Sequence, residues 1–321
     1  MKKQIPLITI ILPTYNNAKT IRECLNGIFM QDYKNFEVLL IDGGSTDDTL
    51  KIASEFKCKI LNNSFRIEER ARVQGIKESK GEILCFLDAD NFLLDKEWLK
   101  KMIKPFEDKE IIGADTLSYT FRKNDPLVTK YCALIGGDDP IAIYLGLYDR
   151  FNYFKNNWTD FPYETEEKNN DYTKVKLNNS KIPAMGSNGF LYRKSALKKI
   201  NYEPFIHTDI IYKLVNSGND KFAKVNTNLV HYLFGIRDFF KKKTRRLKRR
   251  ANNEINIQYK DYGLSKFDIF KSLLWIILII PVFYDTLKGF IRKPSLAWVF
   301  HPIAVYGTLF LYIYYNIKKI F

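Results

Sequence analysis

Residues 7 to 108 alternate four times between short apolar runs and helix-like segments, and this alternation constrains the fold more than any other feature. The run LITIILP (7–13) is continuous and rich in β-branched residues, as is typical of a strand buried on both faces. FEVLLID (36–42), KIL (59–61) and EILCFLDAD (82–90) are further strands, each followed by a helix-like segment. This order predicts an α/β fold with a mostly parallel sheet and helices on both faces.

Three aspartates fall at the predicted strand ends, namely Asp42, Asp88 and Asp90. Ligands of such sheets gather at the carboxyl ends of the strands, so we expect these acids to line one crevice. Two carboxylates one residue apart cannot both enter an apolar core without a large cost. A hard divalent cation, Mg²⁺ or Mn²⁺, would neutralise them together with the oxygens of a bound diphosphate. The alternative for D-x-D alone is a solvated turn.

The formal net charge of +15 is concentrated in one place. The segment KKKTRRLKRR (241–250) carries eight positive charges, and the later segments 272–284 and 294–317 contain no Asp, Glu, Lys or Arg. A basic segment beside apolar ones indicates contact with a membrane rather than nucleic acid, and Phe239, Phe240 and Leu247 are expected to enter the headgroup layer. A solvated helix face is the alternative.

These patterns divide the chain into three parts. We expect a catalytic domain over 1–235, a basic amphipathic segment over 236–265, and a membrane-associated or transmembrane tail over 266–321. As a helix, 294–317 would span roughly 36 Å, enough to cross a bilayer core of about 30 Å. The four cysteines form no C-x-x-C pair, which favours a reducing, cytoplasmic setting for the catalytic domain.

The stretch TIILPTYNNAKTIRECLNGIFMQDYKNFEVLLIDGGSTDDTLKIA, followed by ARVQGIKESKGEILCFLDADN, resembles the nucleotide-sugar-binding half of a family 2 glycosyltransferase with the GT-A fold. The resemblance implies an inverting transferase that uses a nucleoside diphosphate sugar and Mn²⁺ or Mg²⁺. Matched by position, it implies that the nucleotide sugar is bound by Pro13, Thr14, Tyr15, Asp42, Arg72 and Asp88. It also implies that Asp88 and Asp90 hold the metal. For Arg72, a surface ion pair with Glu68 or Glu69 is the alternative.

Two later positions also match the family. AMGSNGFLYRKSAL (184–197) resembles its glycine-containing turn and strand beneath the donor sugar, which places Gly186 in the donor site. His231 resembles a histidine that some relatives place near the metal or the diphosphate, and we expect it to join the metal site. A core histidine is the alternative reading of His231.

The general base is less well matched. Where relatives have a Glu-Asp pair and then an acid, this chain has Ile206 and His207, and only Asp209 keeps an acid. A hydroxyl acceptor needs a base, so Asp209 is the first candidate and His207 the second. A lipid phosphate acceptor would need none. The alternative for Asp209 is a helix N-cap.

We therefore expect a membrane-bound, metal-dependent, inverting glycosyltransferase that acts on a lipid phosphate or a lipid-linked saccharide at the cytoplasmic face. It would be similar to the transferases that act on dolichyl or polyprenyl phosphate. One alternative is a processive polysaccharide synthase, although such enzymes usually carry a Q-x-x-R-W motif that this chain lacks. A second is a non-catalytic membrane scaffold built on a degenerate transferase domain.

Overall fold

The structure is a computed structural model that describes residues 5–63, 65, 67–252, 257, 259 and 262–320, with side chains up to 316. The chain divides into two compact units. The first unit comprises Met1–Leu117 and Pro162–Val230, and the second comprises Ser118–Phe161 and His231–Phe321. The sequence did not indicate that Ser118–Phe161 packs with the C-terminal part of the chain. Part of the basic segment expected over 236–265 lies outside the described residues.

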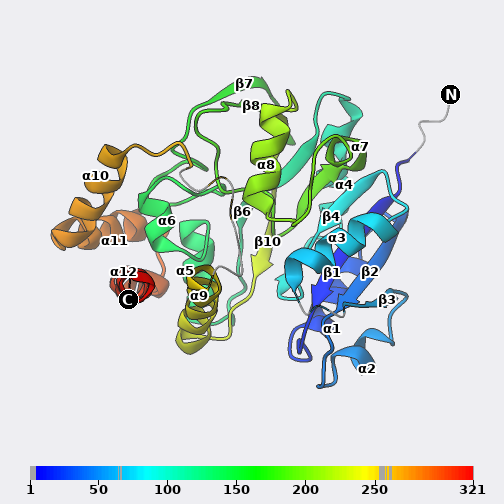
Figure 1. Cartoon of the computed structure of the whole chain (residues 1–321), viewed down its shortest axis with the longest axis horizontal. Coiled ribbons are helices and arrows are strands. Elements are labelled where there is room, and N and C mark those ends of the chain that lie inside the picture. The colour runs from blue at the N-terminus through cyan, green and yellow to red at the C-terminus, as the bar shows by residue number, and fades with distance from the viewer. Residues whose placement is uncertain are drawn as a thin grey trace. The chain divides into compact units, whose positions relative to one another are not determined.

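The N-terminal half of the first unit has the predicted alternation. Strands β1 (Ile8–Thr14), β2 (Phe36–Asp42), β3 (Lys59–Asn62) and β4 (Ile83–Phe86) form a parallel array in the order β3-β2-β1-β4 (Figure 1). β1 and β4 consist mainly of apolar residues and are almost completely buried, whereas the edge strand β3 is mostly exposed. The expected mostly parallel sheet with flanking helices is confirmed.

The sheet continues beyond β4 with strands of mixed direction. Its full order is β3-β2-β1-β4-β9-β6-β10-β8-β7, and β5 pairs with β10 outside this path. β9 runs antiparallel to both β4 and β6. The added strands are β5 (Asn91–Phe92), β6 (Gly113–Tyr119), β7 (Tyr163–Lys168), β8 (Tyr172–Leu177), β9 (Phe190–Arg193) and β10 (Lys221–His231).

Short helices connect the strands of the first unit. They are α1 (Ile21–Phe29), α2 (Thr49–Ala53), α3 (Glu68–Glu78), α4 (Trp98–Ile103), the 3₁₀ turn η1 (Lys104–Glu107), α7 (Lys194–Leu197) and α8 (His207–Asn216). α3 packs closely on the sheet at Gly75. A Cβ atom at this position would lie 2.5 Å from a side-chain carbon of Ile11 and 2.9 Å from one of Ile41, so only glycine allows this approach.

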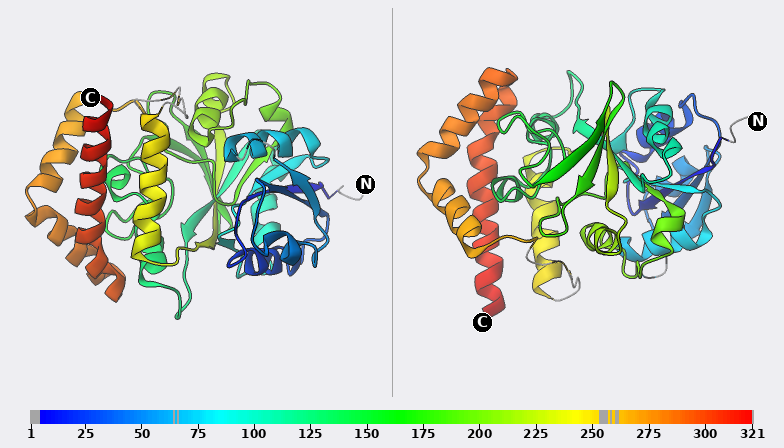
Figure 2. Two further views of the ribbon diagram at one scale, coloured as in Figure 1. Left: turned by 60° about the horizontal axis from the view of Figure 1, so that its bottom comes forward. Right: turned by 90° about the horizontal axis from the view of Figure 1, so that it is seen from above.

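The second unit is mainly helical and has its own core. Its helices are α5 (Leu127–Ile135), α6 (Pro140–Tyr144), α9 (Ile236–Ala251), α10 (Lys266–Ile277), α11 (Ile280–Arg292), the 3₁₀ turn η2 (Leu296–Val299) and α12 (Phe300–Ile320). Tyr131, Phe154, Trp298 and Phe300 are fully buried at its centre. α9 and α12 lie side by side in both views of Figure 2.

The basic helix α9 differs from the expectation in its apolar face. Phe239 and Leu247, expected to enter a headgroup layer, are 1% and 9% exposed because they face the core of the second unit. The Phe239 ring packs edge-on against Phe300 of α12, with centroids 5.3 Å apart. That expectation is wrong, since burial in the protein already accounts for the amphipathic pattern.

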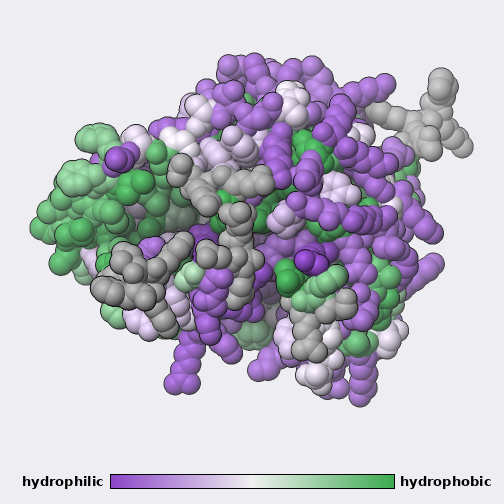
Figure 3. Space-filling view, viewed as in Figure 1, coloured by the Kyte–Doolittle hydropathy of each residue, from purple (hydrophilic) through white to green (hydrophobic). Residues whose placement is uncertain are grey.

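The apolar tail contains one helix that qualifies as a membrane span by length and composition. This helix runs over Leu296–Asn316, and 39% of its most apolar window is buried within the protein. α10 and α11 qualify only together, and they are bent by 84° at the break between them. Hydrophobic side chains gather on the surface over α10 and α11 (Figure 3).

Candidate functional site

The carboxyl ends of β1 and β2 form one side of the candidate site. Thr14 and Asp42 lie opposite each other in the parallel register, and the Gly43 N–H donates to the Thr14 carbonyl at 2.8 Å. Pro13 occupies the preceding register position, opposite Ile41. As predicted, the ends of β2 and β4 meet at one edge of the sheet, with β1 between them.

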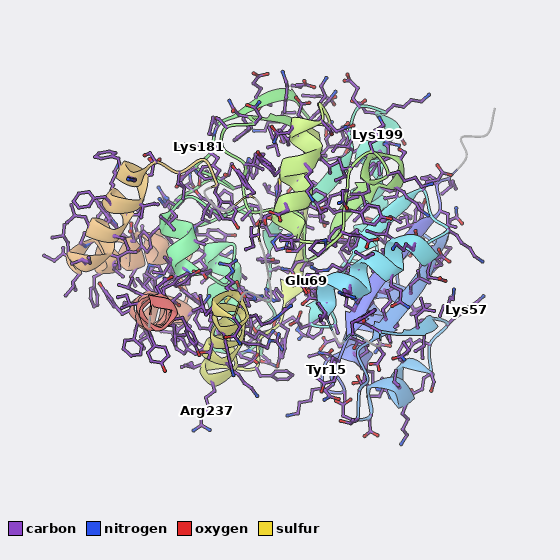
Figure 4. All side chains as sticks on the ribbon, in the orientation of Figure 1. Tyr15, Lys57, Glu69, Lys181, Lys199 and Arg237 are labelled. Atoms are coloured by element: carbon purple, nitrogen blue, oxygen red, sulfur yellow. The ribbon has the colours of Figure 1, made fainter. Side chains whose placement is uncertain are left out.

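Asp42 shapes the turn that leaves β2. One carboxylate oxygen accepts the N–H groups of Gly44 and Ser45, each at 2.8 Å, and the other accepts the Ser45 hydroxyl at 2.5 Å. Two carboxylate oxygens offer about four acceptor positions, so Asp42 retains capacity for a ligand N–H. Tyr15 lies half-exposed at this edge (Figure 4), and a Cβ on Gly43 would lie 3.4 Å from its Cβ.

Two asparagines to which the sequence analysis assigned no role join the loops after β1 and β2. The Asn16 side chain accepts the N–H of Thr46 at 2.8 Å, and the N–H of Asn17 donates to the Thr49 hydroxyl at 2.7 Å. Asn16 adopts a left-handed φ of 52°, which asparagine tolerates better than most residues. The Asn-Asn pair directly after a strand is a turn signal that is present in the sequence.

Arg72 links α3 to the D-x-D motif. Its guanidinium Nη2 lies 3.0 Å from Asp88 Oδ1 and 2.5 Å from Glu68 Oε1. The residue is 5% exposed, and its buried Nε has no hydrogen-bond partner among the described residues. The pairing with Glu68 was the alternative reading, but the same guanidinium also reaches the acid at the strand end. Arg72 therefore belongs to the candidate site.

The surroundings of the Asp88 carboxyl group disfavour its ionised form and so raise its pKa. Burial raises its pKa to about 6, the charges of Glu68 and Asp90 act in the same direction, and the Arg72 guanidinium opposes them. The Asp88 side chain is 30% exposed, so a ligand can still reach it. The site therefore contains more negative charge than Arg72 alone compensates.

Asn91 holds the D-x-D turn, a role that the sequence pattern did not indicate. Its side-chain oxygen accepts the Asp88 N–H at 3.0 Å, and its own N–H donates to the Asp88 carbonyl at 2.9 Å. Its amide nitrogen donates to Asp90 Oδ1 at 3.4 Å and to Asn188 Oδ1 at 3.3 Å. The only signal in the sequence is an asparagine directly after two acids, and the structure shows that it is fully buried.

The glycine-containing turn lies beside the D-x-D motif, as the resemblance implied. The Gly189 N–H donates to the carbonyl of Phe86, the last residue of β4, at 2.7 Å. Gly186 adopts φ 111° and packs against the first turn of α8, where a Cβ would lie 3.3 Å from the His207 Cβ. The glycine-containing turn therefore bridges the metal motif and the candidate base.

His207 and Asp209 both lie in the first turn of α8. The N-cap is Ile206, and Asp209 is the third helical residue, 2% exposed. The N-cap alternative for Asp209 is therefore wrong. Asp209 and His207 stay candidates for the base.

His231 is the last residue of β10 and belongs to the second unit, where its ring lies 5.6 Å from that of Tyr119. It is buried. Its role as a metal ligand stays a prediction.

A divalent cation fits the acids of the D-x-D motif. Burial raises the pKa of Asp88, with the charges of Glu68 and Asp90 acting in the same direction, and a bound cation would favour the ionised carboxylate. Within the described ranges, no group of three or more His, Cys, Asp or Glu side chains is arranged to hold a metal. Asp88 and Asp90 would thus need ligand oxygens, such as those of a diphosphate, to complete the coordination.

Comparison with known sequences defines the family. Residues 9–201, more than half of the chain, match the profile of glycosyl transferase family 2. The chain therefore belongs to this family, as the motifs implied.

Curated relatives match over shorter stretches. Glycosyltransferase AglE of Haloferax volcanii is 31% identical over 141 residues, which cover 41% of this chain and 46% of AglE. A dolichyl N-acetyl-α-D-glucosaminyl phosphate 3-β-D-2,3-diacetamido-2,3-dideoxy-β-D-glucuronosyltransferase of Methanococcus voltae is 35% identical over 109 residues, covering 31% of this chain and 34% of that protein. The matched part of the chain thus spans half or less of the length of these two relatives.

A solved structure confirms the fold. The mannosyltransferase PcManGT from Pyrobaculum calidifontis, in complex with GDP-Man and Mn²⁺, superposes with a TM-score of 0.54 at 14% identity. The match covers 98% of this chain and 88% of PcManGT. The expected GT-A architecture is confirmed.

Proposed function

We propose that this chain transfers a sugar, with inversion and with the help of Mn²⁺ or Mg²⁺, from a nucleoside diphosphate sugar to a lipid-linked acceptor at the cytoplasmic membrane face. One observation carries the proposal. The D-x-D turn is hydrogen-bonded to the glycine-containing turn through Asn91 and Asn188, and that turn packs at Gly186 against the first turn of α8, all within one unit. This arrangement supports a site in which the proposed nucleotide-binding residues, the acids of the D-x-D motif and the candidate base act together.

Each part has a chemical role. Tyr15, Asp42 and the loops around them would hold the nucleotide, with Pro13 and Thr14 beneath it. Arg72 keeps a buried donor that suits an anionic oxygen of the donor. Asp88 and Asp90 would hold the cation, which stabilises the charge of a departing diphosphate. His231 is proposed as a further ligand.

The acceptor determines whether a base is required. A sugar hydroxyl must lose a proton as it attacks, and Asp209 or His207 in α8 would receive it. A lipid phosphate is already anionic near neutral pH and attacks without a base. Support for a lipid-linked acceptor comes from the apolar second unit and from the dolichyl phosphate substrate in the name of the Methanococcus voltae relative.

The test is donor turnover by the full chain in detergent. Several nucleotide sugars are offered with Mn²⁺ or Mg²⁺, together with polyprenyl phosphate or a lipid-linked saccharide. We expect one nucleotide sugar to be consumed only when both the metal and the lipid acceptor are present. Single addition, rather than a long polymer, is the expected product. The proposal fails if no combination of nucleotide sugar and lipid acceptor is turned over and calorimetry detects no binding of nucleoside diphosphate. That result would favour the non-catalytic scaffold.

A further inference from the structure

The second unit presents a continuous apolar face on α11. Six large side chains recur at helical spacing and are 44% to 78% exposed, namely Ile280, Phe283, Tyr284, Leu287, Phe290 and Ile291. A surface helix of a soluble protein buries its apolar stripe and exposes its polar one. α11 departs from this pattern, since its exposed stripe is apolar while Asp285 is only 6% exposed.

The inward side of α11 contains Val282, Asp285 and Gly289, and Asp285 is well hydrogen-bonded. Asp285 Oδ2 accepts the indole N–H of Trp275 at 2.9 Å and the hydroxyl of Tyr144 at 3.1 Å. Arg292 at the end of α11 donates to the carbonyl of Phe154 at 2.7 Å. These bonds hold α10 and α11 against the core of the second unit, so the outward apolar face is a stable feature of the fold.

Neither helix is long enough to cross a bilayer. α10 has 12 residues and α11 has 13, which correspond to about 18 and 20 Å, whereas the hydrocarbon core measures about 30 Å. The chain breaks at Ile279, which adopts φ 63°, and Pro281 follows in the first turn of α11. The resulting 84° bend turns the two helices into a wedge with an apolar tip.

The charges of the wedge match an anionic membrane surface. Residues 272–284, which include the tip, contain no charged side chain. Cations stand on both sides of this stretch, at Lys266 and Lys271 on α10 and at Arg292 and Lys293 at the end of α11, and they outnumber the acids Asp268 and Asp285. Both ends of the wedge therefore suit phosphate headgroups, while the tip suits the acyl layer.

α12 is held in place by ionic groups that a bilayer core would exclude. The hydroxyl of Tyr312 donates to Asp139 Oδ2 at 3.0 Å, and Lys243 of α9 lies 3.3 Å from the same oxygen. Phe240 of α9 packs where a Cβ on Gly307 would stand. A spanning α12 would carry this part of α9, with its cations, into hydrocarbon, where charged side chains are costly.

We propose that the second unit is a monotopic membrane anchor. The α10–α11 wedge inserts into a single leaflet that contains anionic phospholipid, both of its ends stay in the headgroup layer, and α12 remains within the folded unit without crossing the bilayer. This goes beyond the proposed function and does not depend on it, because the surface would bind lipid whether or not the first unit is active.

Flotation with vesicles tests the surface. The full chain is diluted from detergent into vesicles of phosphatidylcholine and phosphatidylglycerol at 3:1, and we expect it to float with them. L287E/I291E, which places two acids on the exposed face, should reduce the floated fraction at least tenfold, with an unchanged melting temperature. The matched control is I60E on β3, where Ile60 is also exposed, and it should float like the wild type.

Two results would overturn the lipid assignment. One is flotation of L287E/I291E equal to that of the wild type. The other is a change of that variant from dimer to monomer without a change in flotation, which would assign the face to a second copy of the chain. Neither readout uses sugar transfer, so failure of the proposed function would not affect them.

A second measurement tests the topology. In a C58S background, because the other three cysteines are buried, single cysteines are introduced by K293C before α12 and by N316C near its end. Sealed membrane vesicles from cells that express the full chain are treated with an impermeant maleimide. The monotopic arrangement requires both cysteines to react from the same side. Reaction of only one until the vesicles are permeabilised would show that α12 crosses the bilayer.

Discussion

Asp90 is the clearest residue for a test of the metal motif. Replacement of Asp90 by Asn removes one of the two carboxylates proposed to hold the cation. We expect metal-dependent turnover to fall about a hundredfold, or about 2.7 kcal/mol of transition-state stabilisation, because the leaving diphosphate loses charge compensation. The measurement is turnover over a Mn²⁺ titration. The melting temperature without metal should not fall, since a like charge next to Asp88 has been removed. Unchanged turnover and metal dependence would refute the metal site.

The raised pKa of Asp88 predicts that the stability of the metal-free protein depends on pH. Burial raises its pKa to about 6 in the folded state, above the value of about 3.9 in an unfolded chain. The folded state therefore binds more protons between pH 4 and 6, and this contribution to stability decreases as pH rises through that window. The wild type should lose stability relative to Asp88→Asn between pH 4 and 6, by up to about 3 kcal/mol. Urea unfolding of both proteins at each pH measures the difference, and parallel curves would contradict it.

Gly186 provides a test at the scale of an element, because its turn precedes β9 and packs between Tyr192 of β9 and the first turn of α8. An added methyl group would lie 2.3 Å from the Tyr192 hydroxyl, and φ 111° is strained for alanine. We expect Gly186→Ala to lower the free energy of unfolding by about 2 kcal/mol more than Gly218→Ala. Gly218 also has a positive φ, of 79°, but a Cβ there would meet nothing within 4 Å. Equal losses in denaturant unfolding would show that the turn adjusts.

At the scale of the whole molecule, the tail is part of a folded unit. Removal of residues 266–321 would uncover Tyr131 and Phe239, both of which pack edge-on against Phe300. Loss of one such large buried aromatic side chain typically costs about 3–5 kcal/mol. We therefore expect the truncated chain to unfold in its second unit and aggregate rather than become a soluble enzyme. Size-exclusion chromatography and near-ultraviolet circular dichroism would show this. A monodisperse, well-ordered truncated chain would contradict it.

The sequence by itself determined the parallel half of the sheet and the position of its acids. Strands buried on both faces have a local signature, a continuous apolar run, and the residue after such a run lies at a predictable edge. The position of Asp42, Asp88 and Asp90 at the carboxyl edge of the sheet therefore follows from the sequence pattern alone. The family resemblance added Gly186 and the first turn of α8, which pack against each other, and the same turn is hydrogen-bonded to the D-x-D motif through Asn188 and Asn91.

Only the tertiary structure decided which distant residues meet. Asn91 bonds Asn188, 97 positions away, and Tyr131 bonds His301, 170 positions away. Such pairs leave no periodic signal in a single sequence, because each partner looks like an ordinary polar residue in its own segment. The same holds for apolar faces. Phe239 and Leu287 are both large apolar residues within helices, yet Phe239 is buried in the core and Leu287 is 57% exposed. Composition specifies that a side chain avoids water, but only the packing of neighbouring helices decides whether protein or lipid replaces the water.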